Sequence, residues 1–173
     1  MTLTVCFHGA ESTGKSVLAS KLSAQLACPW VPEYGRSYCE KHGTDLAMAD
    51  LLAIAAGQAQ ANHATLAGQP ALILHDTDQL MTAAWAEMLF GSIPEVLMNY
   101  PKADLYLLFE ADTQWIDDGT RFFGKGPLRS RFAALAEGVL IRAGVRFERI
   151  SGDWAQREAQ VRAALQAATA VTI

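Results

Sequence analysis

Residues 9–16 read G-A-E-S-T-G-K-S, which matches the pattern G-x-x-x-x-G-K-[ST] without a mismatch. Glycines at both ends of such a loop let the backbone curl, so that successive N–H groups face inward and bind phosphate oxygens. Lys15 can reach the β- and γ-phosphates of a nucleotide, and the Ser16 hydroxyl can ligate Mg²⁺. The residues that we expect to bind the nucleotide are Gly9, Glu11, Ser12, Thr13, Gly14, Lys15, Ser16 and Val17.

The segments on either side of this loop have the pattern that the motif requires. Residues 3–7 are short, apolar and β-prone, and they predict a buried strand. Downstream, apolar residues recur at helical spacing from Val17 to Leu26 and predict a helix. Strand, glycine loop and helix in this order form the P-loop arrangement. We therefore predict that the protein binds ATP together with Mg²⁺.

Acidic residues follow a second apolar run. Residues 71–75 predict a strand, and Asp76 at its tip could hold Mg²⁺ opposite Ser16. Strands often end in aspartate, so this interpretation depends on the P-loop. Asp78 could bind substrate hydroxyls, or it could cap the next helix.

The segment V-P-E-Y-G-R-S-Y places Glu33 directly after a short strand at residues 30–31. A carboxylate here can accept the proton of an attacking hydroxyl. Tyr34 could stack on a flat ring, and Arg36 could bind phosphate or carboxylate oxygens. The alternative is a surface turn with a solvated Glu–Arg pair. Either Glu33 or Asp76 could be the catalytic base, and Glu33 is favoured because Asp76 is better placed for the metal.

A glycine-bearing, basic segment lies late in the chain. Four of the 14 basic residues fall within eleven positions: Arg121, Lys125, Arg129 and Arg131. Since the protein is acidic overall, this local excess predicts a lid loop at about residues 117–131. Arg121 and Arg129, or Arg131, would neutralise charge on the transferring phosphoryl group. The alternative is a solvated surface balanced by Asp117 and Asp118. Trp115, just before the segment, could be a core residue or a ring platform.

Strands and helices alternate along the whole chain. The predicted strands cover residues 3–7, 30–31, 71–75, 105–109 and 145–150. The predicted helices run from the P-loop to about residue 27 and over residues 48–66, 79–89, 132–143 and 153–168, with a loop and short helix at 33–43. This alternation predicts a three-layer α/β/α sandwich with a parallel sheet of about five strands. Ligands should bind at the carboxyl ends of those strands.

Bulk composition limits the function classes. We expect residues 1–173 to form one domain, with 51 % hydrophobic and 18 % charged residues. A net charge of -4 argues against nucleic acid as a partner. Three cysteines without metal-ligand spacing, and no targeting segment before the first strand, predict a cytoplasmic protein with reduced thiols. No apolar stretch approaches the ~20 residues of a membrane helix, so we expect no membrane partner.

Several motifs together resemble a known family. The segments GAESTGKS, VPEYGRSY, LLAIAAGQ, HDTD and WIDDGTR, in this order, resemble the ribosylnicotinamide kinase domain of the NadR type over about residues 3–153. The P-loop is generic, whereas the combination PEY-x-R-x-Y, DTD and W-I-D-D-G-x-R is much more specific. The resemblance implies ATP-dependent phosphorylation of the 5'-hydroxyl of nicotinamide riboside, giving nicotinamide mononucleotide. It also implies a nicotinamide ring held between aromatic residues, for which Tyr34, Tyr38 and Trp115 are the matching candidates.

The expected substrate-binding residues are Glu33, Tyr34, Arg36, Tyr38, Asp78, Trp115 and Asp118. NadR-type proteins can also carry an adenylyltransferase domain and a DNA-binding segment before the kinase. The present sequence starts at the first strand of the kinase, so we expect the kinase activity alone. Two alternatives stay open: a kinase for another nucleoside or metabolite, and a regulatory P-loop ATPase without a small-molecule acceptor. The PEY element and the basic segment argue against the regulatory ATPase.

Overall fold

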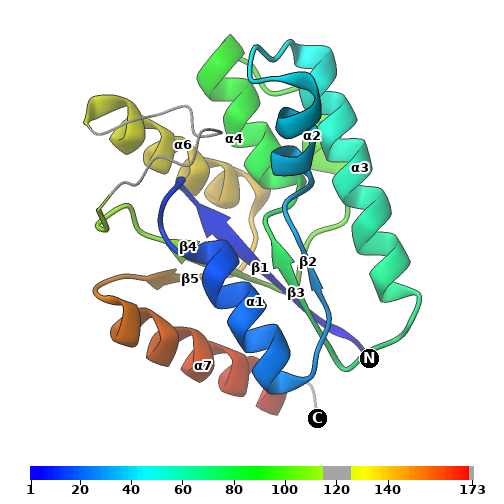
Figure 1. The fold of residues 1–173 in the computed structure, drawn as a ribbon, viewed down its shortest axis with the longest axis vertical. Helices are drawn as coiled ribbons and strands as arrows, with labels where there is room; N and C mark the ends of the chain where they lie inside the picture. Colours follow the sequence, from blue (N-terminus) through cyan, green and yellow to red (C-terminus); the bar gives the residue numbers. More distant parts are fainter. Residues whose placement is uncertain (115–125, 172–173) are drawn as a thin grey trace.

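A computed structural model describes residues 1–114 and 126–171 of the chain. Five parallel strands form one sheet in the order β2-β3-β1-β4-β5 (Figure 1). The strands are β1 (Leu3–Gly9), β2 (Trp30–Val31), β3 (Leu72–Asp76), β4 (Leu105–Phe109) and β5 (Phe147–Ile150). The helices are α1 (Lys15–Leu26), α2 (Tyr34–His42), α3 (Met48–Leu66), α4 (Gln79–Phe90), α5 (Glu95–Asn99), α6 (Pro127–Ala143) and α7 (Trp154–Val171). The predicted α/β sandwich is confirmed.

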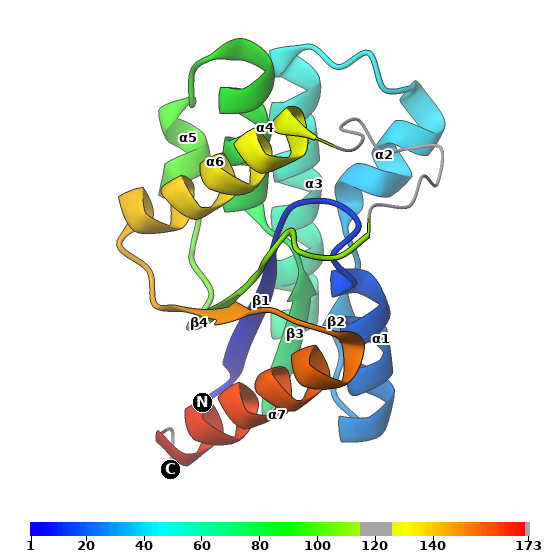
Figure 2. The ribbon, with the colours of Figure 1, turned by 90° about the vertical axis from the view of Figure 1, so that its left-hand side faces the viewer.

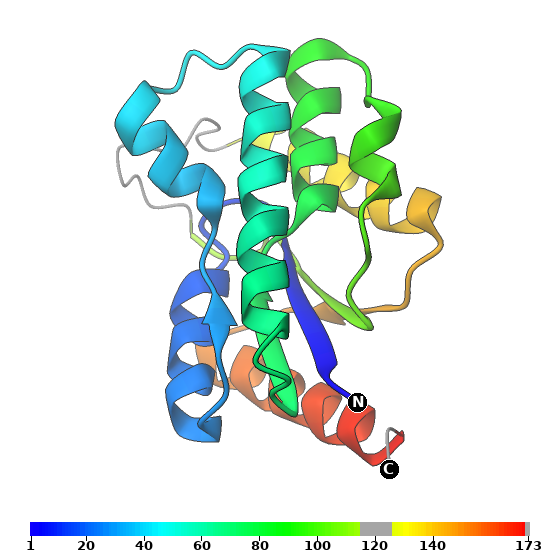
Figure 3. The same cartoon turned by 90° about the vertical axis from the view of Figure 1, so that its right-hand side faces the viewer.

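Alternating residues of β1 pack against different helical layers. Val5 and Phe7 belong to a core cluster with residues of α1 and α7, such as Leu22 and Val161. Cys6 belongs to a second cluster with residues of α3, α4 and α6. Figure 2 shows α6 and α7 on opposite sides of the sheet. In Figure 3, α2, α3 and α4 lie together on the face of the sheet opposite to α7. No helix in the described ranges is long and apolar enough to cross a membrane.

The parallel register brings the carboxyl ends of the central strands to one edge. Phe7 of β1 is paired with Asp76 of β3, and Gly9 is paired with Phe109 of β4. On the outer side, Val31 of β2 is paired with His75, so Glu33 follows two residues beyond that pair. The P-loop, Glu33 and Asp76 therefore gather at the same edge of the sheet, as the alternating pattern predicted.

Two expectations about the helices need correction. Residues 127–131 were expected to belong to the lid loop, but they form the first turn of α6, which begins at Pro127 instead of residue 132. Proline suits this position because its fixed φ matches the helix and its missing N–H would have no helical partner there. The short helix α5 was not predicted at all. Residues 115–125, which include most of the remaining expected lid, lie outside the described residues.

Candidate active site

The backbone of the P-loop requires glycine at its ends. Gly9 has φ +129° and Gly14 has φ +87°, conformations that residues with a side chain rarely adopt. A Cβ atom added to Gly9 would lie 2.4 Å from the carbonyl oxygen of Phe109, so the loop passes directly against β4. α1 begins at Lys15, immediately after the loop, and its first N–H groups therefore point toward the space that the loop encloses.

Lys15 lies across this loop. Its Nζ donates hydrogen bonds to the carbonyl oxygens of Gly9, at 2.9 Å, and Ala10, at 2.7 Å. The side chain of Thr13 also binds the Ala10 carbonyl, at 2.9 Å. Lys15 is 9 % exposed, so its charge is held in a largely dry position beside the loop N–H groups. These groups together form a preorganised site for phosphate oxygens.

Ser16 and Asp76 fit a Mg²⁺ ion. The Ser16 hydroxyl interacts with the Asp76 carboxylate, whose residue is only 2 % exposed. Among the described residues, Asp76 Oδ1 is buried without a hydrogen-bond partner, which is an expensive state for a carboxylate oxygen. A hydroxyl and a carboxylate oxygen are hard ligands of the kind that Mg²⁺ prefers beside nucleotide phosphates. The pair can therefore hold the metal that the P-loop motif predicts.

The backbone between Asp76 and Asp78 is strained. Thr77 has φ +70°, which is unusual for a β-branched residue, and its N–H donates to the carbonyl oxygen of Phe7. The turn directs the side chains of Asp76 and Asp78 toward different partners. Asp76 lies toward Ser16, whereas Asp78 is the N-cap of α4 and accepts from the Leu80 N–H at 2.9 Å. Asp78 can therefore cap α4 and still bind substrate hydroxyls, because it also lines the cavity described below.

Tyr106 holds the other oxygen of Asp78. The Tyr106 hydroxyl donates a hydrogen bond of 2.5 Å to Asp78 Oδ2 from the neighbouring strand β4. Burial raises the pKa of Asp78, while the hydrogen bonds from Tyr106 and the Leu80 N–H act in the opposite direction. Sequence reasoning missed Tyr106, since a tyrosine within an apolar strand gives no sign of its partner.

Glu33 lies at the N-terminus of α2 and faces the P-loop side of the site. Burial, followed by the nearby charge of Asp76, raises the pKa of Glu33 to about 7. Lys15 and Arg36 oppose this shift. A carboxyl group that titrates near neutral pH can accept a proton from a hydroxyl and release it again, as a general base requires. The solvated Glu–Arg turn that the sequence left open is not what the structure shows.

One cavity of about 420 Å³ joins the P-loop to the segments after β2 and β3. All eight residues that were expected to bind the nucleotide line it, and so do Glu33, Arg36 and Asp78. Residues that the sequence did not suggest also line it: Gly35, Cys39, Leu46, Leu51, Ile54, Gln58, Thr77, Met81, Thr82, Trp85 and Phe132. The cavity is thus polar at the P-loop and apolar between α2, α3 and α4, a shape suited to a phosphate donor and a small acceptor.

The aromatic residues of the cavity differ from those expected. Within the described part of the chain, the aromatic rings that line the cavity are Trp85 and Phe132, whose centroids lie 4.5 Å apart. The Tyr34 ring packs on α3 where Gly57 leaves room, since a Cβ at Gly57 would lie 2.3 Å from that ring. Tyr38 donates to Asp50 at 2.7 Å. Tyr34 and Tyr38 are not among the lining residues, and Trp115 lies outside the described residues.

A sequence signal for Trp85 existed. Asp78, Met81, Thr82 and Trp85 are spaced so that they share one face of the helix that follows the DTD motif. Extending the motif along that face would have found the tryptophan.

Arg129 braces the P-loop from α6. Its guanidinium donates to the Thr113 carbonyl at 2.6 Å, to the Thr113 hydroxyl at 3.2 Å, and to the carbonyls of Glu11 and Ser12 at 3.3 Å. The residue is 8 % exposed. The structure therefore gives Arg129 a positioning role that was not expected, and its contact with a γ-phosphoryl group stays a prediction. The other expected residues of this region, Arg121 and Asp118, lie outside the described residues.

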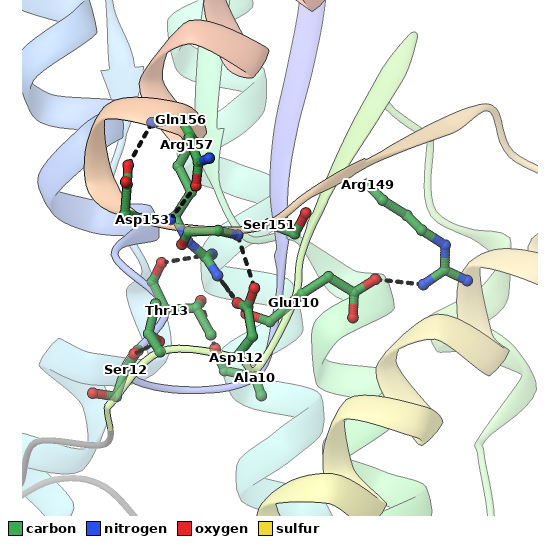
Figure 4. A network of polar contacts seen from close by, with 12 residues as sticks. Ala10, Ser12, Thr13, Glu110, Asp112, Arg149, Ser151, Asp153, Gln156 and Arg157 are labelled. Carbon is green, nitrogen blue, oxygen red and sulfur yellow. Dashed lines mark hydrogen bonds and ion pairs between the residues drawn. The ribbon is translucent and has the colours of Figure 1, made fainter.

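Arg157 braces the loop from α7 and was missed by sequence reasoning. It is 1 % exposed, and its Nη1 donates to the Thr13 carbonyl at 3.3 Å (Figure 4). The same side chain binds the carbonyls of Gly152 and Glu110, and it forms an ion pair with Asp112. One arginine therefore ties the P-loop to the ends of β4 and β5. Nothing in the surrounding sequence marks it, because its partners are far apart along the chain.

The two histidines at strand ends, His8 and His75, are buried. His8 is fully buried, and its Nε2 lies 2.9 Å from the Ala136 carbonyl, which fits a donated hydrogen bond. Burial lowers the pKa of His8 to about 3 and that of His75 to about 4. Both rings are therefore neutral at physiological pH.

A parallel sheet with this strand order, a P-loop after β1 and a buried acid at the tip of β3 define a P-loop protein with the kinase fold. Residues 4–157 match the sequence model of a family described as "AAA domain", and the chain belongs to this family.

Two curated relatives resemble the chain over most of its length. It is 31 % identical over 154 residues to the "Trifunctional NAD biosynthesis/regulator protein NadR" of Escherichia coli (strain K12), covering 85 % of this chain and 38 % of that protein. The protein of the same description from Salmonella typhimurium (strain LT2) is 31 % identical over 151 residues, covering 83 % and 37 %. The chain thus spans under two fifths of these relatives, and it shows the NadR-type resemblance that the motifs indicated.

Solved structures show the same fold. A NadR protein in complex with NR superimposes with a TM-score of 0.81 at 22 % identity, over 95 % of this chain and 51 % of that chain. A NadR protein in complex with NAD and AMP-PNP gives a TM-score of 0.76 at 21 % identity, over 99 % and 51 %. Thymidylate kinase from Ehrlichia chaffeensis gives 0.70 at 13 % identity, over 95 % and 98 %.

Proposed function

We propose that the protein is an ATP-dependent kinase that phosphorylates the 5'-hydroxyl of nicotinamide riboside to give nicotinamide mononucleotide. The observation that carries this proposal is the position of Glu33. Its carboxyl group has a pKa of about 7, lines the cavity between the P-loop and the apolar acceptor end, and lies close to Asp76. The NadR relatives and the NadR structure with NR support nicotinamide riboside as the acceptor.

In the proposed reaction, the acceptor hydroxyl attacks the γ-phosphorus in line with the bond to the β–γ bridging oxygen. The new O–P bond forms as the bridging bond breaks, and ADP leaves. Glu33 takes the proton of the hydroxyl, while Lys15 and the loop N–H groups bind the phosphate oxygens. Ser16 and Asp76 would hold Mg²⁺, which would supply positive charge to balance the phosphates. Arg121 and Arg129 are the proposed further contacts to the transferring group.

The acceptor end offers polar and apolar contacts suited to a nucleoside. Asp78, which accepts a hydrogen bond from Tyr106, is proposed to accept hydrogen bonds from the ribose hydroxyls as well. Arg36, which lines the same cavity, is proposed to bind oxygens of the phosphoryl group being transferred. Trp85, with Phe132 beside it, is the proposed surface for the nicotinamide ring. Tyr34, Tyr38, Trp115 and Asp118 remain proposed contacts from the resemblance alone.

The test is ADP release in a coupled assay. ATP and Mg²⁺ are supplied with nicotinamide riboside, adenosine, cytidine, uridine, gluconate or shikimate as acceptor. Turnover that is much faster with nicotinamide riboside than with the other acceptors supports the proposal. Preference for another acceptor would replace the substrate while keeping the kinase. ATP hydrolysis that no acceptor stimulates would instead indicate a regulatory ATPase.

A further inference from the structure

The turn between β5 and α7 is fixed by side chains on almost every backbone group. The backbone N–H and C=O of Ser151 form two hydrogen bonds of 3.0 Å with the Gln160 side-chain amide. The Gly152 N–H donates to Asp112 at 2.8 Å. Asp153 and Gln156 cap the start of α7, since the N–H of each donates to the side chain of the other at 2.9 Å (Figure 4). These hydrogen bonds fix the backbone that immediately precedes Trp154.

Trp154 lies against the P-loop although most of its surface is exposed. A Cβ atom added to Gly14 would lie 2.3 Å from Cζ3 of the Trp154 ring, so the ring rests on the last residue of the loop. The side chain is nevertheless 60 % exposed. Arg157, one helical turn further on, binds the Thr13 carbonyl and keeps this part of α7 in place. A large π surface therefore stands open beside the phosphate site.

Trp154 and the proposed acceptor site lie on opposite sides of the P-loop. Glu33 follows β2 and Trp154 follows β5, and these strands form the two outer edges of the sheet. The P-loop follows β1, the central strand between them. In-line transfer places the attacking and leaving groups on opposite sides of the γ-phosphorus. If the acceptor lies between Glu33 and Trp85, the nucleoside of the donor must extend toward the β5 side.

We infer that Trp154 is a stacking platform for the flat heteroaromatic base of the nucleotide whose phosphates bind in the P-loop. The inference rests on the proposed function, because that function places the donor phosphates and the acceptor. Aromatic residues bind bases through their π faces with little dependence on base identity. Trp154 should therefore raise the affinity for a nucleoside triphosphate and have no effect on a triphosphate that lacks a base.

The experiment compares Mg-ATP with Mg-tripolyphosphate, measured by calorimetric titration. Trp154→Ala should weaken ATP binding roughly 5- to 50-fold and leave tripolyphosphate affinity unchanged. Trp154→Phe, which keeps a ring, should recover most of the ATP affinity. The matched control is Ile141→Ala on α6, because Ile141 is 62 % exposed and lies outside the cavity lining. This control should bind both ligands as the original protein does.

Equal weakening of both ligands in Trp154→Ala would overturn the inference, because the tryptophan would then only brace the loop. Unchanged ATP affinity in the same variant would overturn it too. A protein that shows the selective ATP loss, but transfers phosphate to no hydroxyl compound, would support the base platform and refute the proposed kinase. The two proposals can therefore fail separately.

Discussion

Glu33 lies near enough to Asp76 for the negative charge of Asp76 to raise the Glu33 pKa, which burial has already raised, to about 7. The two carboxyl groups thus differ in their surroundings, and we expect them to differ in role. Asp76 is directed toward Ser16 and has an unpartnered oxygen for a metal, whereas Glu33 can exchange a proton near neutral pH.

Replacing Glu33 with Gln should slow phosphoryl transfer roughly 10²- to 10⁴-fold, because the amide cannot accept the proton. ATP affinity should stay the same. The rate of the original protein should also rise with pH through about 7, and this dependence should disappear in the variant. Steady-state kinetics between pH 5 and 9 measure both effects. A larger rate loss in Asp76→Asn, with metal affinity unchanged, would exchange the roles of the two acids.

The same pKa shift predicts a change in stability. A Glu33 pKa of about 7, against an ordinary value of 4.5, means that the folded state binds the proton more tightly than the unfolded state. This contribution is present below pH 4.5 and is lost as the pH rises from 4.5 through about 7. Between pH 5 and pH 8, the free energy of unfolding should therefore fall less in the Glu33→Gln variant than in the original protein. Urea unfolding at both pH values tests this, and identical losses would contradict the shift.

Lys15→Ala should reduce transfer by roughly 10²-fold or more, because it removes a fixed positive charge from the phosphate site. Lys15 Nζ donates hydrogen bonds to groups of the loop itself, the carbonyls of Gly9 and Ala10 and the Thr13 hydroxyl, so we expect the melting temperature to change little. Turnover and a thermal melt of the same preparation give the two numbers. Near-normal turnover would refute the assignment of the P-loop.

Ligands should stabilise the fold in a defined order. At a free concentration 100 times its dissociation constant, a ligand that binds only the folded state adds about 2.7 kcal/mol. Mg-ATP should raise the melting temperature, and nicotinamide riboside should raise it further when a non-hydrolysable ATP analogue is present. A rise with the nucleotide that no nucleoside increases would favour the regulatory ATPase.

Trp85→Leu keeps apolar bulk but removes the π face from the cavity. Nicotinamide in its riboside is a pyridinium cation, and a cation over an aromatic face gains about 0.5–2 kcal/mol. The Michaelis constant should therefore rise more for nicotinamide riboside than for its neutral reduced form, with that for ATP nearly constant. Trp30→Leu is the control, because Trp30 packs in the other core cluster. Equal losses for the two ribosides would contradict the cation–π account.

The parts of this molecule that sequence could predict are those fixed by local patterns. The P-loop is a contiguous motif, and β2 and β4 have the predicted bounds because short apolar runs between turn residues are unambiguous. The start of α6 was wrong, since the glycines and basic residues before Arg131 suggested a loop while Pro127 starts a helix. Glycine and proline mark both loops and helix ends, so the pattern alone does not separate them.

The site residues that escaped prediction act through distant partners. Arg157 binds a carbonyl 144 positions earlier in the chain, and Arg129 binds one 118 positions earlier. Trp154 rests on a glycine of the first loop. Such contacts depend on the order of the strands in the sheet, which sequence spacing does not reveal. The position of Glu33 in the cavity could be predicted because it depends on the end of a single strand.

The bracing of the P-loop by Arg129 and Arg157 has a consequence for biosynthesis. The loop precedes α6 and α7 in the chain, and Arg129 and Arg157 of these helices bind loop carbonyls 118 and 144 residues earlier. A nascent chain that has exposed only the glycine motif lacks both arginines. Because domains fold as units during synthesis, the nucleotide site should mature only when α7 has left the ribosome, so that ATP cannot hold an unfinished chain in a half-folded form.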